Sequence, residues 1–140
     1  MKILINRKTV NSAWGGGNKF VRGFWDYASN YGVEVTAKFS ADIDAILVIG
    51  SEPYPDVGIG INEILRFKSA YPHVKLVYRM NDHNLCKDAR NAFDGAKRAY
   101  SRFCEGTIFV SKWLEEYYLE KKERKSTDWV KGYNKWKKNK

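Results

Sequence analysis

Short apolar runs recur five times along the chain, and each is bounded by polar or turn-forming residues. They cover residues 3–5, 33–36, 45–49, 74–78 and 107–110. Short continuous runs of this kind are typical of strands that are buried on both faces of a sheet. The pattern therefore predicts five strands.

Between these runs, apolar residues return at intervals of three and four, which is the spacing of amphipathic helices. We expect helices over residues 17–31, 60–71 and about 84–104, and a last helix that begins at Ser111. Gly32 and Pro72 provide the stops of the first two helices, and Ser111 is a good N-cap. On the longest helix we expect Phe103 in the apolar stripe and Lys97 on the face that points away from it.

Strands that alternate with helices predict an α/β fold, with a Rossmann-like parallel sheet of about five strands and helices on both faces. The link from Thr36 to Ala45 is too short for a helical crossover. We therefore expect the two strands that it joins to lie apart, or at the edge of the sheet.

The length of 140 residues fits one domain, which we place at residues 1–125, followed by a basic tail or helix at 126–140. The formal net charge is +9, and residues 112–140 contribute ten basic and five acidic side chains, or +5. A basic tail can contact nucleic acid or an anionic membrane surface, and it can equally be a solvated terminus.

The two cysteines, Cys86 and Cys104, do not form a CxxC pair, so we expect neither a metal nor a disulfide framework and infer a reducing compartment. His83 has only Cys86 at ligand spacing, which is too little for a metal site. No apolar run approaches the roughly 20 residues of a membrane span. We expect a cytoplasmic protein that can lie at the periphery of a membrane.

Ligands of open parallel sheets bind in the loops that leave the carboxyl ends of the strands. The first such loop carries Gly15, Gly16 and Gly17, followed by Asn18 at the opening of a helix. Consecutive glycines allow a close approach, and free amides at a helix N-terminus favour phosphate. The alternative is a turn that binds nothing.

The loops after the third and fourth runs also carry polar side chains that suit a ligand. Glu52 lies in a loop shaped by two prolines, and Arg79, Asn81 and Asp82 follow the fourth run. Arginine can hold a phosphate or carboxylate in a fork, while Asn81 and Asp82 can accept hydrogen bonds from sugar hydroxyls. The alternative for Asp82 is that it caps the next helix.

Four features, in this order, resemble the N-terminal domain of GT-B fold glycosyltransferases that use nucleotide sugars. They are Lys2-Ile3-Leu4-Ile5, the glycine loop with Asn18-Lys19-Phe20-Val21, the stretch Val77-Tyr78-Arg79-Met80-Asn81-Asp82, and Thr107-Ile108-Phe109-Val110-Ser111-Lys112-Trp113-Leu114. The resemblance covers residues 1–125 and implies a Rossmann-like domain that binds the acceptor. By this analogy, Gly15, Gly16, Gly17 and Asn18 lie near the donor phosphates. The acceptor side is lined by Arg79, Asn81 and Asp82, to which we add Glu52.

Members of that family carry a second Rossmann-like domain that holds most of the nucleotide sugar, and this chain stops where that domain would begin. We therefore expect the acceptor half of a nucleotide-sugar-dependent glycosyltransferase whose activity needs a second domain or partner chain. The expected partners are a carbohydrate acceptor and either a donor-binding chain or a second copy. No cofactor is expected to be tightly bound, and the nucleotide sugar is a co-substrate. The alternatives are a non-catalytic sugar- or phosphate-binding module and an adaptor that acts through its basic tail.

Overall fold

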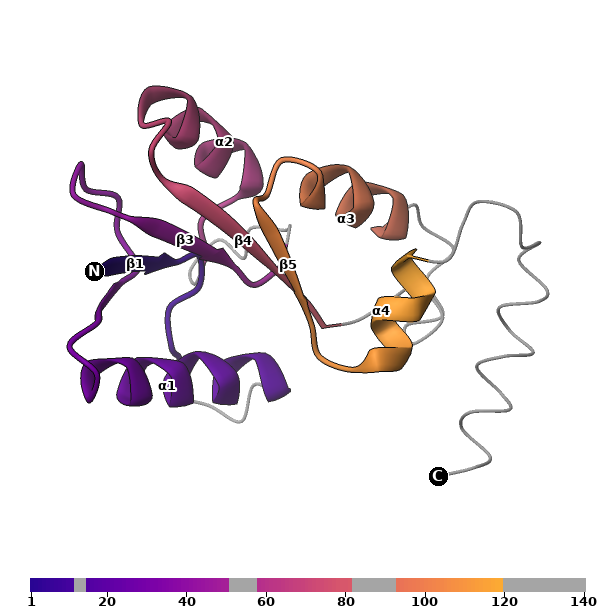
Figure 1. Ribbon diagram of the computed structural model, residues 1–140. Helices are drawn as coiled ribbons and strands as arrows, with labels where there is room; N and C mark the ends of the chain where they lie inside the picture. Colours follow the sequence, from indigo (N-terminus) through magenta and orange to yellow (C-terminus); the bar gives the residue numbers. More distant parts are fainter. Residues whose placement is uncertain (12–14, 51–57, 82–92, 120–140) are drawn as a thin grey trace.

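Five parallel strands form a sheet that lies between helices (Figure 1). The computed structural model describes residues 1–11, 15–50, 58–81 and 93–119. Its elements are β1 (Lys2–Ile5), α1 (Gly15–Ser29), β2 (Glu34–Thr36), β3 (Ala45–Val48), α2 (Ile61–Ala70), β4 (Lys75–Met80), α3 (Phe93–Ser101), β5 (Gly106–Phe109) and α4 (Lys112–Leu119). The strand order is β2-β1-β3-β4-β5, and every pairing is parallel. The predicted α/β class, with a Rossmann-like five-stranded sheet, is confirmed.

The order of the strands explains the short link between residues 36 and 45. β2 and β3 both pair with β1, from opposite sides, and β2 lies at the edge of the sheet. The two strands are therefore separated by one strand, as the sequence predicted. The order 2-1-3-4-5 is one of the two common doubly wound orders, and its switch point lies between β1 and β3.

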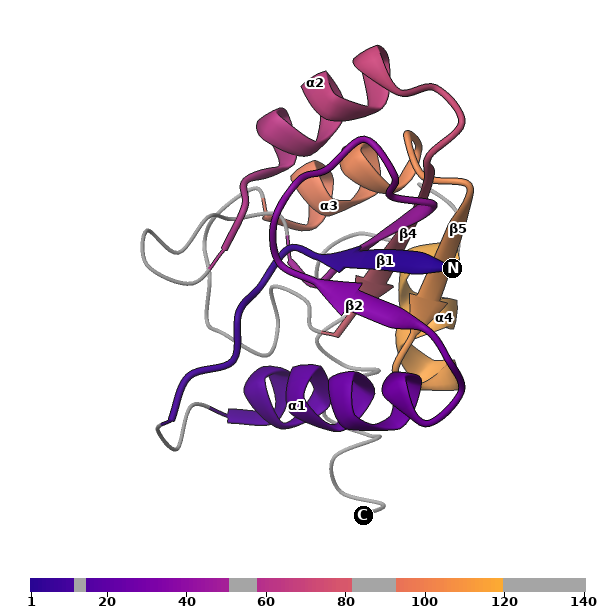
Figure 2. The same ribbon diagram turned by 90° about the vertical axis from the view of Figure 1, so that its left-hand side faces the viewer.

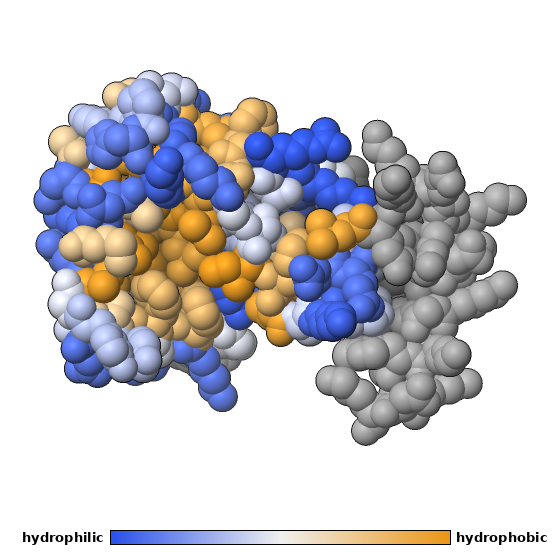
Figure 3. Space-filling model, in the orientation of Figure 1, coloured by the Kyte–Doolittle hydropathy of each residue, from blue (hydrophilic) through white to orange (hydrophobic). Residues whose placement is uncertain are grey.

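Helices cover the two faces of the sheet unequally within the described residues. α1 packs on one face, where Val21 meets Ile5 and Ile49, while α2, α3 and α4 contribute to the core on the other face. Figure 1 shows α1 on one side of the strands and α2 and α3 on the other. Figure 3 shows apolar surface in the middle of the molecule, between α1 and α2.

Two expectations about the longest helix are wrong. Lys97 is buried, with 9% of its surface exposed, because it lies one turn before Tyr100 and so shares the inner face of α3. Phe103 is 58% exposed, because α3 ends at Ser101 and the helical stripe does not reach it. The start predicted near residue 84 lies outside the described residues.

The predicted helix boundaries agree more closely at the other helices. α1 is followed by Gly32 with φ of +68°, a backbone conformation that glycine adopts readily. At the start of α4, the Ser111 hydroxyl accepts a hydrogen bond from the Leu114 amide at 3.2 Å, which confirms the predicted cap. Since all strands are parallel, the residues that follow β1, β3, β4 and β5 gather at one edge of the sheet. We call this the carboxyl edge.

Candidate functional site

Asn6, the first residue after β1, fixes the geometry of the carboxyl edge. Its side chain is 1% exposed, and its Oδ1 accepts a hydrogen bond from the Ile49 amide at 2.7 Å. Its Nδ2 donates to the carbonyl oxygens of Gly50 and Ile59, at 3.1 Å each. One buried amide therefore holds the ends of β1 and β3 to the segment that leads into α2.

Arg7 follows Asn6 and lies against the end of β3. Gly50 has φ of +110°, and a methyl group at this position would lie 3.0 Å from Nη2 of Arg7. A methyl group on Gly17 would lie 3.9 Å from Nη1 of the same guanidinium. Arg7 is thus placed between β3 and the first turn of α1, at the switch point of the sheet. Glycine is required at position 50 both for its backbone conformation and for this close approach.

Arg79, near the end of β4, reaches the same helix. Its guanidinium carbon lies 4.0 Å from the centre of the Phe20 ring, a cation–π contact. The side chain is half-buried, and this burial lowers the pKa of Arg79. Nη1 is buried, and no atom of the described residues accepts a hydrogen bond from it. The guanidinium group thus presents a desolvated donor with no acceptor in the described parts of the chain.

The contacts of the two arginines bring them to one flank of α1. Gly17 and Phe20 are three residues apart on this helix, so they face the same side. The first turn of α1 holds no acidic residue, and the N-terminus of a helix carries a partial positive charge. Within the described ranges, none of the ion pairs includes Arg79. The electrostatics of this part of the carboxyl edge therefore favour an anion.

No group of three or more His, Cys, Asp or Glu side chains within the described ranges could hold a metal ion. In the same ranges, no helix is long and apolar enough to cross a membrane.

The glycines and Asn18 of the predicted phosphate loop lie in α1. Gly15 is its first residue, and a methyl group on Gly16 would meet open space. Asn18 holds the preceding segment in place: its Oδ1 accepts from the Val10 amide at 3.0 Å, and its Nδ2 donates to the Val10 carbonyl at 2.9 Å. The role of these residues toward a ligand stays a prediction.

The acceptor-side residues are only partly described. Arg79 lies at the carboxyl edge as above, and Asn81 is an exposed residue directly after β4. Glu52 and Asp82 lie outside the described residues. Asn6 and Arg7 are not among the predicted ligand residues, although both follow the first apolar run at a place where ligand-binding residues are expected.

The comparisons with known proteins return few matches. No protein-family model and no curated protein matches the chain. A solved structure that matches is RcsB from Salmonella enterica serovar Typhimurium, bound to promoter rprA in the presence of phosphomimetic BeF3−. The two chains are 18% identical with a TM-score of 0.45, and the match covers 96% of this chain and 66% of that one. This chain thus spans just under two thirds of the RcsB chain, and a likeness at this level says nothing about what it binds.

The expected membership of the GT-B glycosyltransferases is wrong, because the matching structure is RcsB and no glycosyltransferase is found. The assignment as an acceptor half and the expected carbohydrate acceptor are corrected with it. The physical reason is that the four motifs are parts of ordinary strand–loop–helix units. Such units occur throughout parallel α/β folds.

Proposed function

We propose that this domain binds a small anionic ligand, through a phosphate or carboxylate group, at the carboxyl edge of its sheet between α1 and β4. Arg79 supplies the principal contact, and Arg7 and the first turn of α1 supply further positive potential. Guanidinium groups bind such anions through paired, charge-assisted hydrogen bonds.

The observation that carries the proposal is the environment of Arg79. A guanidinium group is costly to remove from water unless it gains hydrogen-bonding partners. Here the Phe20 ring covers the group, Nη1 is buried, and the described residues provide no acceptor for it. An anionic ligand at this edge would satisfy that donor.

Calorimetric titration with sodium pyrophosphate at low ionic strength tests the proposal. We expect the wild-type protein to bind and the variant Arg79→Gln to bind at least tenfold more weakly, since a charge-assisted hydrogen bond contributes roughly 1.5–3 kcal/mol. The matched control is Arg66→Gln, because Arg66 is exposed on α2, on the opposite face of the sheet. Equal affinities for Arg79→Gln and Arg66→Gln would refute the proposal, as would no binding to the wild-type protein.

A further inference from the structure

A cavity lies on the flank of α1 opposite to Gly17 and Phe20. It has a volume of about 620 Å³ and is formed between α1 and the edge strand β2. Residues that follow β1 and β2, Lys8 and Lys38 among them, close it at the carboxyl end. Figure 2 shows β2 in front of the sheet with α1 running alongside it. The volume lies within the range of roughly 300–1,000 Å³ that is usual for small-molecule sites. We call this cavity the β2 groove.

Three cationic side chains line the β2 groove, and they come from three separate segments. Lys8 follows β1, Arg22 lies on α1, and Lys38 follows β2. Within the described ranges, none of the three takes part in an ion pair. Their charges therefore act on the groove.

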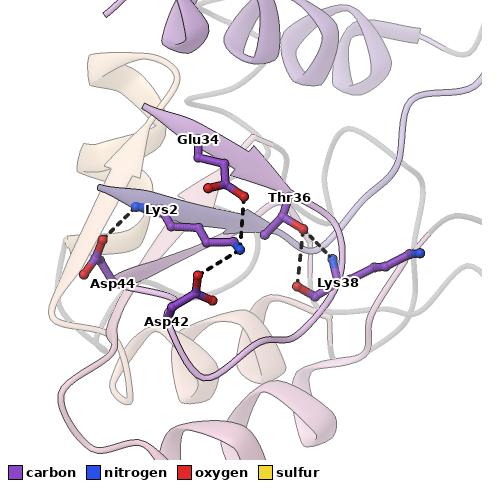
Figure 4. Close-up of polar contacts among 6 residues, drawn as sticks. All are labelled: Lys2, Glu34, Thr36, Lys38, Asp42 and Asp44. Carbon is purple, nitrogen blue, oxygen red and sulfur yellow. Dashed lines mark hydrogen bonds and ion pairs between the residues drawn. The ribbon is translucent and has the colours of Figure 1, made fainter. Parts of the chain in front are cut away.

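A hydrogen-bonded turn fixes the main chain of Lys38 at the groove. The Thr36 hydroxyl accepts a hydrogen bond from the Lys38 amide at 3.1 Å, which forms a tight turn at the end of β2. Figure 4 shows the side chain of Lys38 extending away from Glu34 and Asp42.

Two acidic residues, Asp26 and Glu34, also line the groove, and one of them forms an ion pair. Glu34 pairs with Lys2, with Oε1 3.0 Å from Nζ, and Lys2 also contacts Asp42 at 3.1 Å (Figure 4). Because Lys2 is shared between two carboxylates, both Asp26 and Glu34 count against the three cations, which leaves a formal net charge of +1. The groove thus has a positive balance.

Apolar side chains form part of the lining of the groove, and an indole ring is among them. Trp25 lines the groove and is half-buried against the core cluster of α1, and Val35 of β2 belongs to both as well. A tryptophan that is held by the core offers a rigid surface for stacking a flat ring. Cations that surround such a surface complement a negative charge on the same ligand.

We propose that the β2 groove binds a ligand in which a flat aromatic or heteroaromatic ring carries a phosphate or carboxylate group. The ring stacks on Trp25, and Lys8, Arg22 and Lys38 hold the anionic group. This site is independent of Arg79. Arg79 belongs to β4, which is separated from β2 by two strands, and it meets the opposite flank of α1 through Phe20.

Adenosine 5′-monophosphate and 1-naphthyl phosphate serve as probes, with adenosine and inorganic phosphate as the ring-only and anion-only controls. Calorimetry should show that at least one of the two probes binds more tightly than both controls. Arg22→Glu should weaken that binding at least fivefold, whereas Lys19→Glu should leave it unchanged. Lys19 is exposed on the same helix but does not line the groove, so the two variants carry the same change in net charge.

Trp25→Phe and Arg79→Gln complete the test. Trp25→Phe keeps an aromatic surface and should weaken binding less than Trp25→Ala. Arg79→Gln removes phosphate binding at β4, so the probe affinity that remains in this variant belongs to the β2 groove. The inference is overturned if neither probe binds more tightly than the controls, or if Arg22→Glu and Lys19→Glu have equal effects. Loss of pyrophosphate binding in Arg79→Gln, with the probe affinity retained, separates this inference from the proposed function.

Discussion

Replacing Asn6 by aspartate perturbs the carboxyl edge with almost no change in shape. The aspartate keeps one oxygen in the place of Oδ1, where it accepts the hydrogen bond from the Ile49 amide. Its second oxygen replaces Nδ2 and faces the carbonyl oxygens of Gly50 and Ile59 at 3.1 Å each. When ionised, this oxygen is repelled by both carbonyls, and when protonated it can donate to one of them. The neutral form is therefore favoured in the folded protein, and the pKa of this aspartate should be raised.

The magnitude follows from that shift. An aspartate in the unfolded chain has a pKa of about 3.9, and full burial raises the pKa of a carboxyl group by up to roughly 3–5 units. Well below a pH of about 3.9 both states are protonated, and the variant should lose only about 1 kcal/mol, for one missing hydrogen bond. Above that pH the unfolded chain ionises while the folded state does not. Stability then falls by about 1.4 kcal/mol per pH unit until the folded pKa is reached. A shift of about 3 units therefore adds about 4 kcal/mol, and the total loss at pH 7 is about 5 kcal/mol.

Urea denaturation, followed by circular dichroism between pH 4 and pH 8, measures this loss. The matched control is Asn30→Asp, because Asn30 is exposed just beyond α1 and makes no such side-chain contacts in the described chain. The difference in unfolding free energy between Asn6→Asp and the wild type should grow with pH, and that of Asn30→Asp should stay nearly constant. A difference for Asn6→Asp that does not change with pH would refute the assigned hydrogen bonds.

Three further predictions concern other parts of the molecule. Gly50→Ala should destabilise the protein by roughly 1–3 kcal/mol, because the alanine would have a positive φ and its methyl group would contact Arg7. Thermal unfolding measures this loss, with Gly23→Ala as the control because a methyl group at Gly23 meets open space. Lys68 and the Leu76 amide lower the pKa of Glu105 to about 2. Glu105→Gln should therefore cost about 1 kcal/mol at pH 7, after allowance for solvent screening, and this difference should vanish as the pH falls from 4.5 toward 2. Burial raises the pKa of Cys104 to about 11, so in a Cys86→Ser background its alkylation at pH 8 should be about a hundredfold slower than in urea; equal rates would contradict this.

Local patterns were sufficient to predict the sheet. Residues 45–48 are recognisable as a buried strand because their apolar run is continuous, and residues 75–80 because Leu76, Val77 and Tyr78 form an apolar centre. Parallel pairing then follows from the intervening helices. The same local logic failed at Lys97, where a long side chain lies on the inner face of α3. A pattern of residue types does not show that the aliphatic stem of a lysine can be buried.

The sequence predicts less of the candidate site than of the sheet, because the contacts of the site join distant segments. Arg7 meets Gly50 across 43 positions, and Arg79 meets Phe20 across 59. No periodicity connects such pairs, and only the strand order brings them to one edge. Arg79 could be predicted as a ligand residue because ligands of open parallel sheets bind at the carboxyl ends of the strands. The family assignment, in contrast, rested on motifs that are common to many α/β proteins.

The most direct test of the anion site is the NMR signal of the Arg79 Nε–H group, assigned with Arg79→Lys and followed as sodium pyrophosphate is added. We predict a saturable shift of this signal, at pyrophosphate concentrations that match the calorimetric affinity, while the signal of Arg66 stays in place. A stationary Arg79 signal, or equal shifts of both arginines, would contradict the assignment of an anion site between α1 and β4.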